Sequence, residues 1–229
     1  KMIEDPNSTI DNQHSSFHSC LCLALSAIFF LVAAGYSSAQ TRYVVKWVND
    51  VDTIVLTNGW RFRYIGIDAP EIDHDNQKAQ PYGYLARSFN KKLVGSQKIV
   101  LEFDEERHDR YGRLLAYIFL ADGSCLNSRM LENGMAFYLY RRPNVKYDKR
   151  LLKKQQAAMK AQKGLWRNWK EVKSEYIGNQ NSRRFHQVAC PNAKNIKRKN
   201  RTIFSTKWAA FYAGYAPAKN CIQEFWSYE

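Results

Sequence analysis

The chain has 229 residues and a formal net charge of +14 at pH 7. A hydrophobic content of 45% and 14 tyrosines argue against a disordered chain and predict a folded core. The length suits one core domain of roughly 100–150 residues with a small additional piece.

The charge is unevenly distributed along the chain. Residues 1–140 hold 14 basic and 16 acidic groups, a net −2, whereas residues 141–229 hold 21 basic and 5 acidic groups, a net +16. A strongly basic end beside a nearly neutral body favours a polyanionic partner, with nucleic acid ahead of an anionic membrane. The alternative is a solvated tail whose charge only keeps the chain soluble.

An apolar segment covers residues 17–34, and small residues follow it up to Ala39. This pattern predicts a signal peptide over residues 1–39, cut after Ala39. Acidic residues outweigh Lys1 ahead of the segment, which is atypical of a signal, so an uncleaved membrane anchor is the alternative. In either case we expect the body of the chain to be exported, either secreted or periplasmic.

The remaining chain alternates between strand and helix patterns. Five segments read as strands: residues 42–48, 53–56, 60–67, 98–103 and 114–120. Three read as helices: residues 81–94, 126–132 and 147–163. This number and order is typical of an α+β fold, a five-stranded oligonucleotide-binding barrel with three helices. We assign it to residues 40–170, and a small basic Cys/His module to residues 171–229.

Acidic residues converge at one end of the predicted sheet. Asp52 begins the second strand and Asp68 ends the third, and antiparallel pairing places both at the same end. Two aspartates there can hold a hard divalent cation through oxygen. Glu71 follows three residues after Asp68, near enough to act as general base on a water beside the metal.

Basic and aromatic residues complete the predicted site. Arg63 and Arg113 can grip phosphate oxygens and stabilise the charge that develops in phosphodiester hydrolysis. Tyr111, Tyr138 and Tyr140 are candidates to stack on neighbouring bases. The alternative for the tyrosines is a half-buried place in the core.

The run from Arg42 to Trp169 resembles the thermonuclease (staphylococcal nuclease) family. Four stretches carry the resemblance: Asn-Asp-Val-Asp-Thr at 49–53, the run 61–71 (Arg-Phe-Arg-Tyr-Ile-Gly-Ile-Asp-Ala-Pro-Glu), Asp-Arg-Tyr-Gly-Arg-Leu-Leu-Ala-Tyr at 109–117, and Gly-Leu-Trp at 164–166. Members of the family hydrolyse DNA and RNA with calcium and leave 3′-phosphates.

The resemblance implies roles for individual residues. Arg63, Glu71 and Arg113 take the catalytic places. Asp52, Asp68 and the carbonyl of Ala69 take the places of the calcium ligands. Two departures are visible: Val51 stands where the family usually has glycine, and Ala69 stands where the best-known member has threonine.

Residues 176–221 are similar to a small metal-binding module that follows some bacterial nucleases of this family. The pattern usually supplies four ligands, but the third place is Ala218 here, which leaves His186, Cys190 and Cys221. A structural zinc site wants four ligands, so zinc is disfavoured. A Cys190–Cys221 disulfide in an exported chain and two free thiols remain as alternatives.

These patterns together predict an exported, calcium-dependent nuclease that acts on DNA, RNA or both. We expect a monomer with no obligate protein partner. The alternative is a barrel that binds nucleic acid with little or no catalysis.

Overall fold

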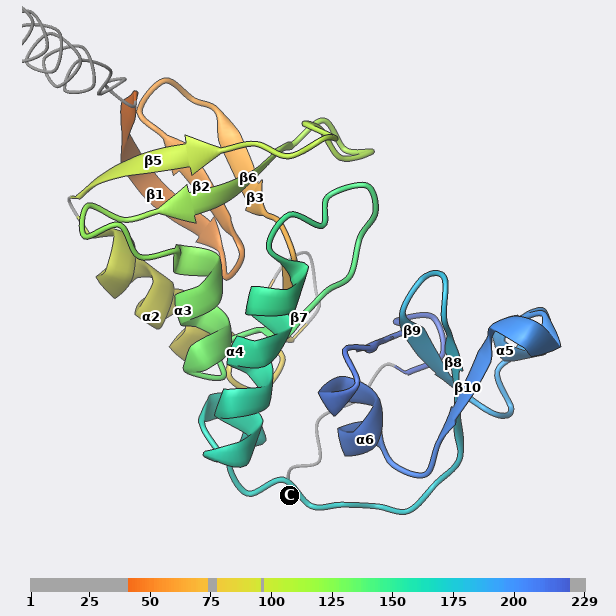
Figure 1. The fold of residues 1–229 in the computed structure, drawn as a ribbon. Helices are drawn as coiled ribbons and strands as arrows, with labels where there is room; N and C mark the ends of the chain where they lie inside the picture. The colour runs from red at the N-terminus through yellow and green to blue at the C-terminus, as the bar shows by residue number, and fades with distance from the viewer. Residues whose placement is uncertain (1–40, 74–77, 96, 223–229) are drawn as a thin grey trace, which may run out of the picture. The chain divides into compact units, whose positions relative to one another are not determined.

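A closed five-stranded barrel forms the first part of the chain in the computed structural model, which describes residues 41–73, 78–95 and 97–222 (Figure 1). The barrel strands are β1 (Arg42–Asp50), β2 (Thr53–Leu56), β3 (Arg61–Tyr64), β5 (Lys98–Glu102) and β6 (Leu114–Phe119). They follow the order β1-β2-β3-β6-β5 around the barrel. The predicted α+β barrel is therefore confirmed.

The pairing of the strands explains how the barrel closes. Neighbouring strands are antiparallel except β3 and β6, which run parallel with Phe62 opposite Leu114. Register shifts in β1 between Val45 and Trp47 and between Val48 and Asp50 bend that strand. Bulky side chains such as Ile54 and Phe62 point inward and are fully buried, which supplies the main driving force for closure.

The third strand is shorter than predicted. Residues 60–67 were expected to form one strand, but β3 ends at Tyr64 and Gly66 adopts a φ of +76°. A Cβ at Gly66 would also clash with Cδ1 of the buried Leu151, so both the backbone angle and the packing favour glycine here. After this turn, β4 (Ile67–Asp68) leaves the barrel and pairs with β7 (Phe137–Tyr138).

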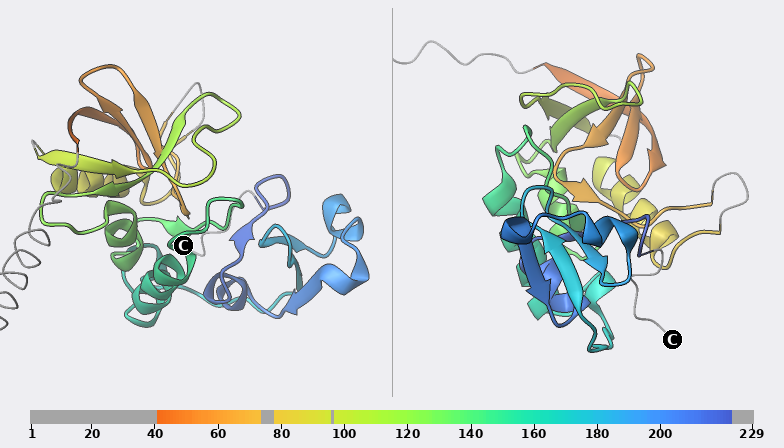
Figure 2. Two further views of the ribbon diagram at one scale, coloured as in Figure 1. Left: turned by 45° about the horizontal axis from the view of Figure 1, so that its top comes forward. Right: turned by 90° about the vertical axis from the view of Figure 1, so that its right-hand side faces the viewer.

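Three helices pack beside the barrel, close to their predicted bounds: α2 (Gly83–Val94), α3 (Leu126–Glu132) and α4 (Asp148–Lys160). Two further views show α3 and α4 side by side (Figure 2). The buried side chain of Asn127 in α3 accepts from Ile118 N and donates to Ile65 O, which fixes the chain just before the turn at Gly66. A 3-10 turn, η1 (Gly164–Trp166), follows α4.

A second sheet occupies the C-terminal segment, by which we mean residues 171–222. Its strands are β8 (Tyr176–Asn179), β9 (Arg184–Gln187), β10 (Arg201–Phe204) and β11 (Ala216–Pro217), in the order β10-β8-β9-β11. The helical elements are α5 (Pro191–Lys194), η2 (Arg198–Asn200) and α6 (Lys207–Tyr212). The Thr206 hydroxyl accepts from Ala209 N and caps α6.

The core of the C-terminal segment is built partly from the preceding part of the chain. Phe211 of α6 packs against Trp166 with ring centroids 5.2 Å apart and against Phe185 at 5.3 Å. The buried side chain of Gln155 in α4 accepts from Tyr138 N and donates to Phe211 O, both at 2.6 Å. The C-terminal segment is thus packed onto α4 and β7.

No helix among the described residues combines the length and hydropathy needed to cross a membrane. The apolar residues 17–34, for which we expect a signal peptide or an anchor, lie outside the described residues.

Candidate active site

Arg63 lies between the two aspartates that were predicted to converge. Its Nη1 donates to Asp52 Oδ1 at 3.1 Å, and its Nη2 lies 2.9 Å from both Asp52 Oδ2 and Asp68 Oδ1. Strand register explains the first contact, because Arg63 pairs with Thr53, the residue after Asp52. The second follows from the turn at Gly66, which brings β4 back beside the end of β3.

The two carboxylates differ in their electrostatic surroundings. Both side chains are almost fully buried, with exposures of 6% and 4%. Burial raises the pKa of Asp52 to about 6, and Arg63 only partly offsets it. Burial also acts to raise the pKa of Asp68, but Lys219, Arg63 and Arg184 outweigh it and lower that pKa below its ordinary value.

Glu71 stands on the turn that follows β4. Its backbone is fixed by Gln80, since Glu71 N donates to Gln80 Oε1 at 3.0 Å and Gln80 N donates to Glu71 O at 2.9 Å. The carboxylate is 41% exposed and accepts from Lys219 Nζ at 2.9 Å. The backbone of Glu71 is therefore fixed, while solvent can reach its side chain.

Arg113 is held by Asp109, a residue that sequence reasoning did not assign to the site. Asp109 Oδ1 accepts from the backbone N of Tyr111 and of Arg113, and Oδ2 accepts from Arg113 Nε at 2.7 Å. Burial acts to raise the pKa of Asp109, but these bonds from Arg113 and Tyr111 lower it overall. An aspartate that begins a tight turn four residues before an arginine was the signal that could have identified this pair.

A cavity of about 520 Å³, here called the central cavity, joins these groups. Five predicted residues line it: Arg63, Asp68, Glu71, Tyr111 and Arg113. Seven further charged or amide side chains line it: Asp50, Asp109, Arg110, Arg141, Asn144, Arg184 and Lys219. The last two come from the C-terminal segment, and no local motif pointed to Lys219 as a site residue.

The three predicted tyrosines have different environments. Tyr111 is 67% exposed and lies beneath the guanidinium groups of Arg110 and Arg113, so its ring is accessible from the central cavity. Tyr138 is 4% exposed and belongs to the core. Tyr140 lines a separate groove together with Arg142. In this structure only Tyr111 of the three lines the central cavity.

The oxygen atoms at this site suit a hard cation. Asp52 and Asp68 share one guanidinium, and the raised pKa of Asp52 shows that its buried charge is not fully compensated. Ala69 is buried and follows Asp68 directly, and its amide donates to Asp68 Oδ1 at 3.2 Å. Carboxylate and carbonyl oxygens are the ligands that calcium prefers.

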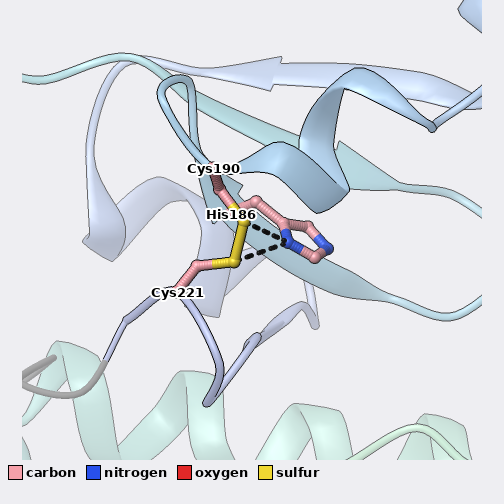
Figure 3. A group of neighbouring side chains, drawn as sticks. All are labelled: His186, Cys190 and Cys221. Atoms are coloured by element: carbon pink, nitrogen blue, oxygen red, sulfur yellow. Dashed lines mark hydrogen bonds between the residues drawn. A yellow bond between two sulfur atoms is a disulfide. The ribbon is translucent and has the colours of Figure 1, made fainter.

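His186, Cys190 and Cys221 come together in the C-terminal segment (Figure 3). Cys190 and Cys221 form a disulfide, and His186 Nδ1 lies 3.6 Å and 3.5 Å from their sulfur atoms. The three ligand atoms lie within 4.8 Å of one another, so with both cysteines reduced these side chains could also hold a metal ion. Cys125, the free cysteine in the described part of the chain, is 2% exposed and packs in the core.

The barrel part of the chain is similar to known nucleases. Residues 61–168 match the family model described as "Staphylococcal nuclease homologue". The chain is 39% identical over 140 residues to a thermonuclease of Staphylococcus hyicus, an alignment that covers 59% of the chain and 82% of that relative. It is 40% identical over 136 residues to endonuclease YncB of Bacillus subtilis, covering 57% of the chain and 61% of the relative.

A third relative matches a larger share of the chain. Endonuclease YhcR of Bacillus subtilis is 27% identical over 216 residues, which is 82% of this chain but 18% of that protein. The similarity therefore extends well beyond the residues that the family model matches.

Proposed function

Because the chain belongs to the thermonuclease (staphylococcal nuclease) family, and is therefore a nuclease that hydrolyses phosphodiester bonds, we propose a calcium-dependent mechanism centred on Glu71. The observation that carries the proposal is the arrangement of Arg63, Asp68, Glu71 and Arg113 around one cavity, with Asp52 directly behind Arg63. DNA, RNA or both are the substrates.

The calcium site consists of the side chains of Asp52 and Asp68 and the carbonyl of Ala69. When bound, the cation supplies Lewis-acid stabilisation of the phosphate and holds a water near Glu71. In the structure, Arg63 and Lys219 lie against Asp68. Arg63 also lines the central cavity, where a phosphate oxygen would meet its guanidinium.

Glu71 acts as the general base. Its carboxylate accepts a proton from the water as the water oxygen bonds to phosphorus. The bond from phosphorus to the 5′-oxygen breaks, and that oxygen takes up a proton from solvent, which leaves a 3′-phosphate and a 5′-hydroxyl. The partial exposure of Glu71 allows the proton to pass on to solvent afterwards.

Arg63 and Arg113 bind the non-bridging oxygens of the phosphate. Both guanidiniums are already oriented, by Asp52 and Asp68 in one case and by Asp109 in the other. Orientation before the reaction lowers the cost of stabilising the additional negative charge in the transition state.

A digestion experiment tests the activity and its cation. Plasmid DNA and total RNA are incubated with the protein in calcium, in magnesium, or in calcium with EGTA. We expect digestion in calcium that EGTA abolishes, and fragments that polynucleotide kinase labels directly because they carry 5′-hydroxyl ends. Full activity in EGTA would exclude calcium dependence, and DNA that is bound but never shortened would favour the binding-only alternative.

We further propose that the protein is exported and acts as a monomer. The apolar residues 17–34 and the Cys190–Cys221 disulfide support export, because disulfides persist in oxidising compartments. Fractionation of cells that express the full chain tests this, and recovery in the cytosol with free thiols would contradict it. Sedimentation at several protein concentrations tests the monomer.

A further inference from the structure

Two cationic side chains of the C-terminal segment line the central cavity alongside the barrel residues. Arg184 is the first residue of β9, and Lys219 follows two residues after β11. Residues 63 and 184 are far apart in sequence, yet they border one cavity of about 520 Å³. The cavity therefore has one wall that the proposed chemistry does not use.

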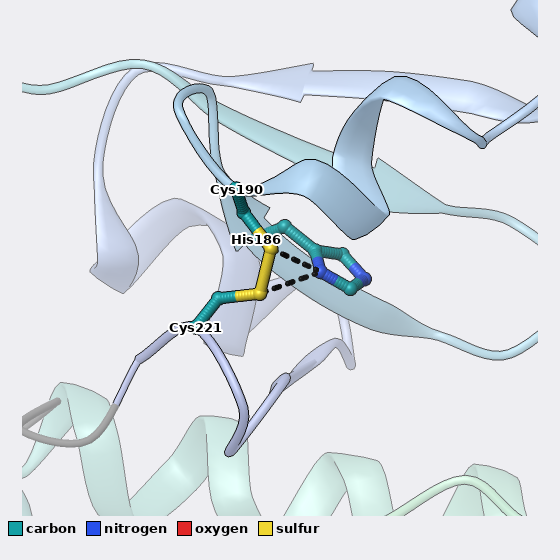
Figure 4. The surroundings of a disulfide bond; sticks show 3 residues. All are labelled: His186, Cys190 and Cys221. Carbon is teal, nitrogen blue, oxygen red and sulfur yellow. Dashed lines mark hydrogen bonds between the residues drawn. A yellow bond between two sulfur atoms is a disulfide. The ribbon is translucent and has the colours of Figure 1, made fainter.

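The backbone around these two cations is fixed. β11 pairs in parallel with β9, with Ala216 opposite Arg184, and Ala218 N donates to Phe185 O at 2.9 Å. Two residues after Lys219, Cys221 is joined by the disulfide to Cys190, close to the end of β9 (Figure 4). The two cations are thus held on one cross-linked support.

Their side chains retain the capacity to bind an anion. A guanidinium has five N–H donors, whereas within the described part of the chain Arg184 makes one long bond, from Nη1 to Pro217 O at 3.4 Å. Burial lowers the pKa of Arg184, and the attraction of Asp68 does not fully offset it. The side chain of Lys219 is 46% exposed, so its ammonium can exchange Glu71 and Asp68 for another anion.

The charge of the cavity lining favours a polyanion. Six cationic and four anionic side chains line it, and the surplus of two equals the contribution of the C-terminal segment. Arg63 and Arg113 bind the scissile phosphate in the proposed mechanism. Arg184 and Lys219 are therefore available for a second anionic group. Nucleic acid provides such charges at its neighbouring phosphates.

We propose that Arg184 and Lys219 bind a phosphate of the substrate other than the scissile one, so that the C-terminal segment forms one wall of the substrate cleft. This inference rests on the proposed nuclease function. Lys219, which lies beside Glu71 and Asp68 in this structure, would turn to the phosphate of a bound substrate. Among the residues that the structure describes, Arg184 makes no ion pair with Glu71 or Asp68, although its charge helps to lower the pKa of Asp68. It therefore gives a cleaner test than Lys219.

The experiment compares two substrates at saturating calcium. A dinucleoside monophosphate contains the scissile phosphate alone, whereas a single-stranded octanucleotide also has neighbours. Arg184→Gln should raise KM for the octanucleotide about tenfold more than KM for the dinucleotide, the loss typical of a hydrogen bond to a charged group. Lys219→Gln should raise KM for the octanucleotide in the same direction.

Binding without cleavage provides a second readout. Anisotropy of a fluorescein-labelled octanucleotide in EGTA gives Kd directly, and the dependence of log Kd on log salt concentration should lose a slope of about 0.7 in Arg184→Gln. Lys199→Gln is the matched control, because it makes the same change of charge in η2, outside the central cavity. It should leave the ratio of the two KM values unchanged.

The outcomes separate this inference from the function on which it rests. Wild-type protein that cuts neither substrate overturns the nuclease mechanism, while the anisotropy still tests the phosphate contact. Equal effects of Arg184→Gln on both substrates, or an equal effect of Lys199→Gln, overturn the inference. A Lys219→Gln variant with higher kcat and unchanged KM would show instead that Lys219 only restrains Glu71.

Two controls complete the experiment. Thermal melts verify that each variant is folded. Arg184→Lys, which keeps the charge, should give a KM between those of wild type and Arg184→Gln.

Discussion

The two walls of the central cavity hold their charges in different ways. On the barrel wall, Arg63 and Arg113 are fixed by ion pairs of 2.7–2.9 Å to nearly buried carboxylates. On the C-terminal wall, Lys219 is half exposed and Arg184 makes one long hydrogen bond. Rigid groups suit a reaction that needs fixed geometry, whereas groups that can exchange partners suit reversible binding. We therefore expect substitutions on the barrel wall to affect turnover and those on the C-terminal wall to affect affinity.

Glu71→Gln is expected to have the largest effect. It removes the base but keeps the size of the side chain, so kcat should fall about 10²–10⁴-fold, with the affinity for an oligonucleotide largely kept. Glu132→Gln is the control, since it removes an acid of α3 that pairs with Lys154 outside the cavity. Near-wild-type turnover of Glu71→Gln would contradict the assignment of the base.

Arg113→Ala should reduce kcat about 10²–10³-fold, the loss found when one transition-state donor is removed. Arg110→Ala is the matched comparison, because Arg110 lines the same cavity and stacks on the same Tyr111 ring but lacks the clamp from Asp109. A change in KM alone for Arg113→Ala would contradict the expectation that the barrel wall acts on turnover.

Phe211→Ala tests whether the two walls belong to one folding unit. Phe211 is 1% exposed and touches Trp166, Phe185 and Phe137, so its truncation should cost about 3–5 kcal/mol. We expect a single thermal transition at lower temperature, as for Phe62→Ala in the barrel. Val172→Ala, at a residue that is 65% exposed, should change little. A separate early transition would show that the C-terminal segment unfolds alone.

Asp148→Asn should have the smallest effect, and it depends on pH. Burial raises the pKa of Asp148 to about 6, with partial compensation from Tyr138 and from Arg183 of the C-terminal segment. The folded state then holds this proton more tightly than the unfolded state does, so stability falls as pH rises from about 4 to about 6. Asparagine removes that loss.

The Tm of Asp148→Asn should therefore equal that of wild type near pH 4 and exceed it at pH 7. About 2–4 °C is expected, the shift for about 1 kcal/mol in a chain of this size, because partial exposure discounts the full pKa shift. Asp122→Asn should show the opposite sign, since hydrogen bonds from Ser124 lower the pKa of Asp122. A difference in Tm that stays constant with pH would contradict the prediction for Asp148.

The sequence predicted the barrel wall because its groups are local. Arg63, Asp68 and Glu71 fall within nine residues, and strand pairing needed only a hairpin to add Asp52. The bounds of most strands and helices were also predicted within about three residues. The break at Gly66 was not, since apolar residues on both sides continued the strand pattern while β4 pairs with a partner 70 residues away.

The C-terminal wall could not be predicted from local patterns. Lys219 lies 148 residues from Glu71 along the chain, and nothing in the sequence around Lys219 distinguishes it from other lysines of the basic end. The sequence left open whether Tyr138 is buried, because local patterns do not show that Gln155 and the C-terminal segment pack on β7. Deletion of the C-terminal segment should therefore disturb the barrel side as well, since Phe137 and Trp166 would lose buried packing partners.

Gln155 forms hydrogen bonds with two parts of the chain that the ribosome makes at different times. Its carbonyl oxygen accepts from Tyr138 N, a residue already synthesised, whereas its amide nitrogen donates to Phe211 O, 56 residues later. At about 5–20 residues per second, the ribosome needs about 3–11 seconds to supply that second partner. During this interval the barrel residues are all present, but one face of α4 lacks its cover. The C-terminal segment, which is translated after α4, therefore completes the packing around Gln155.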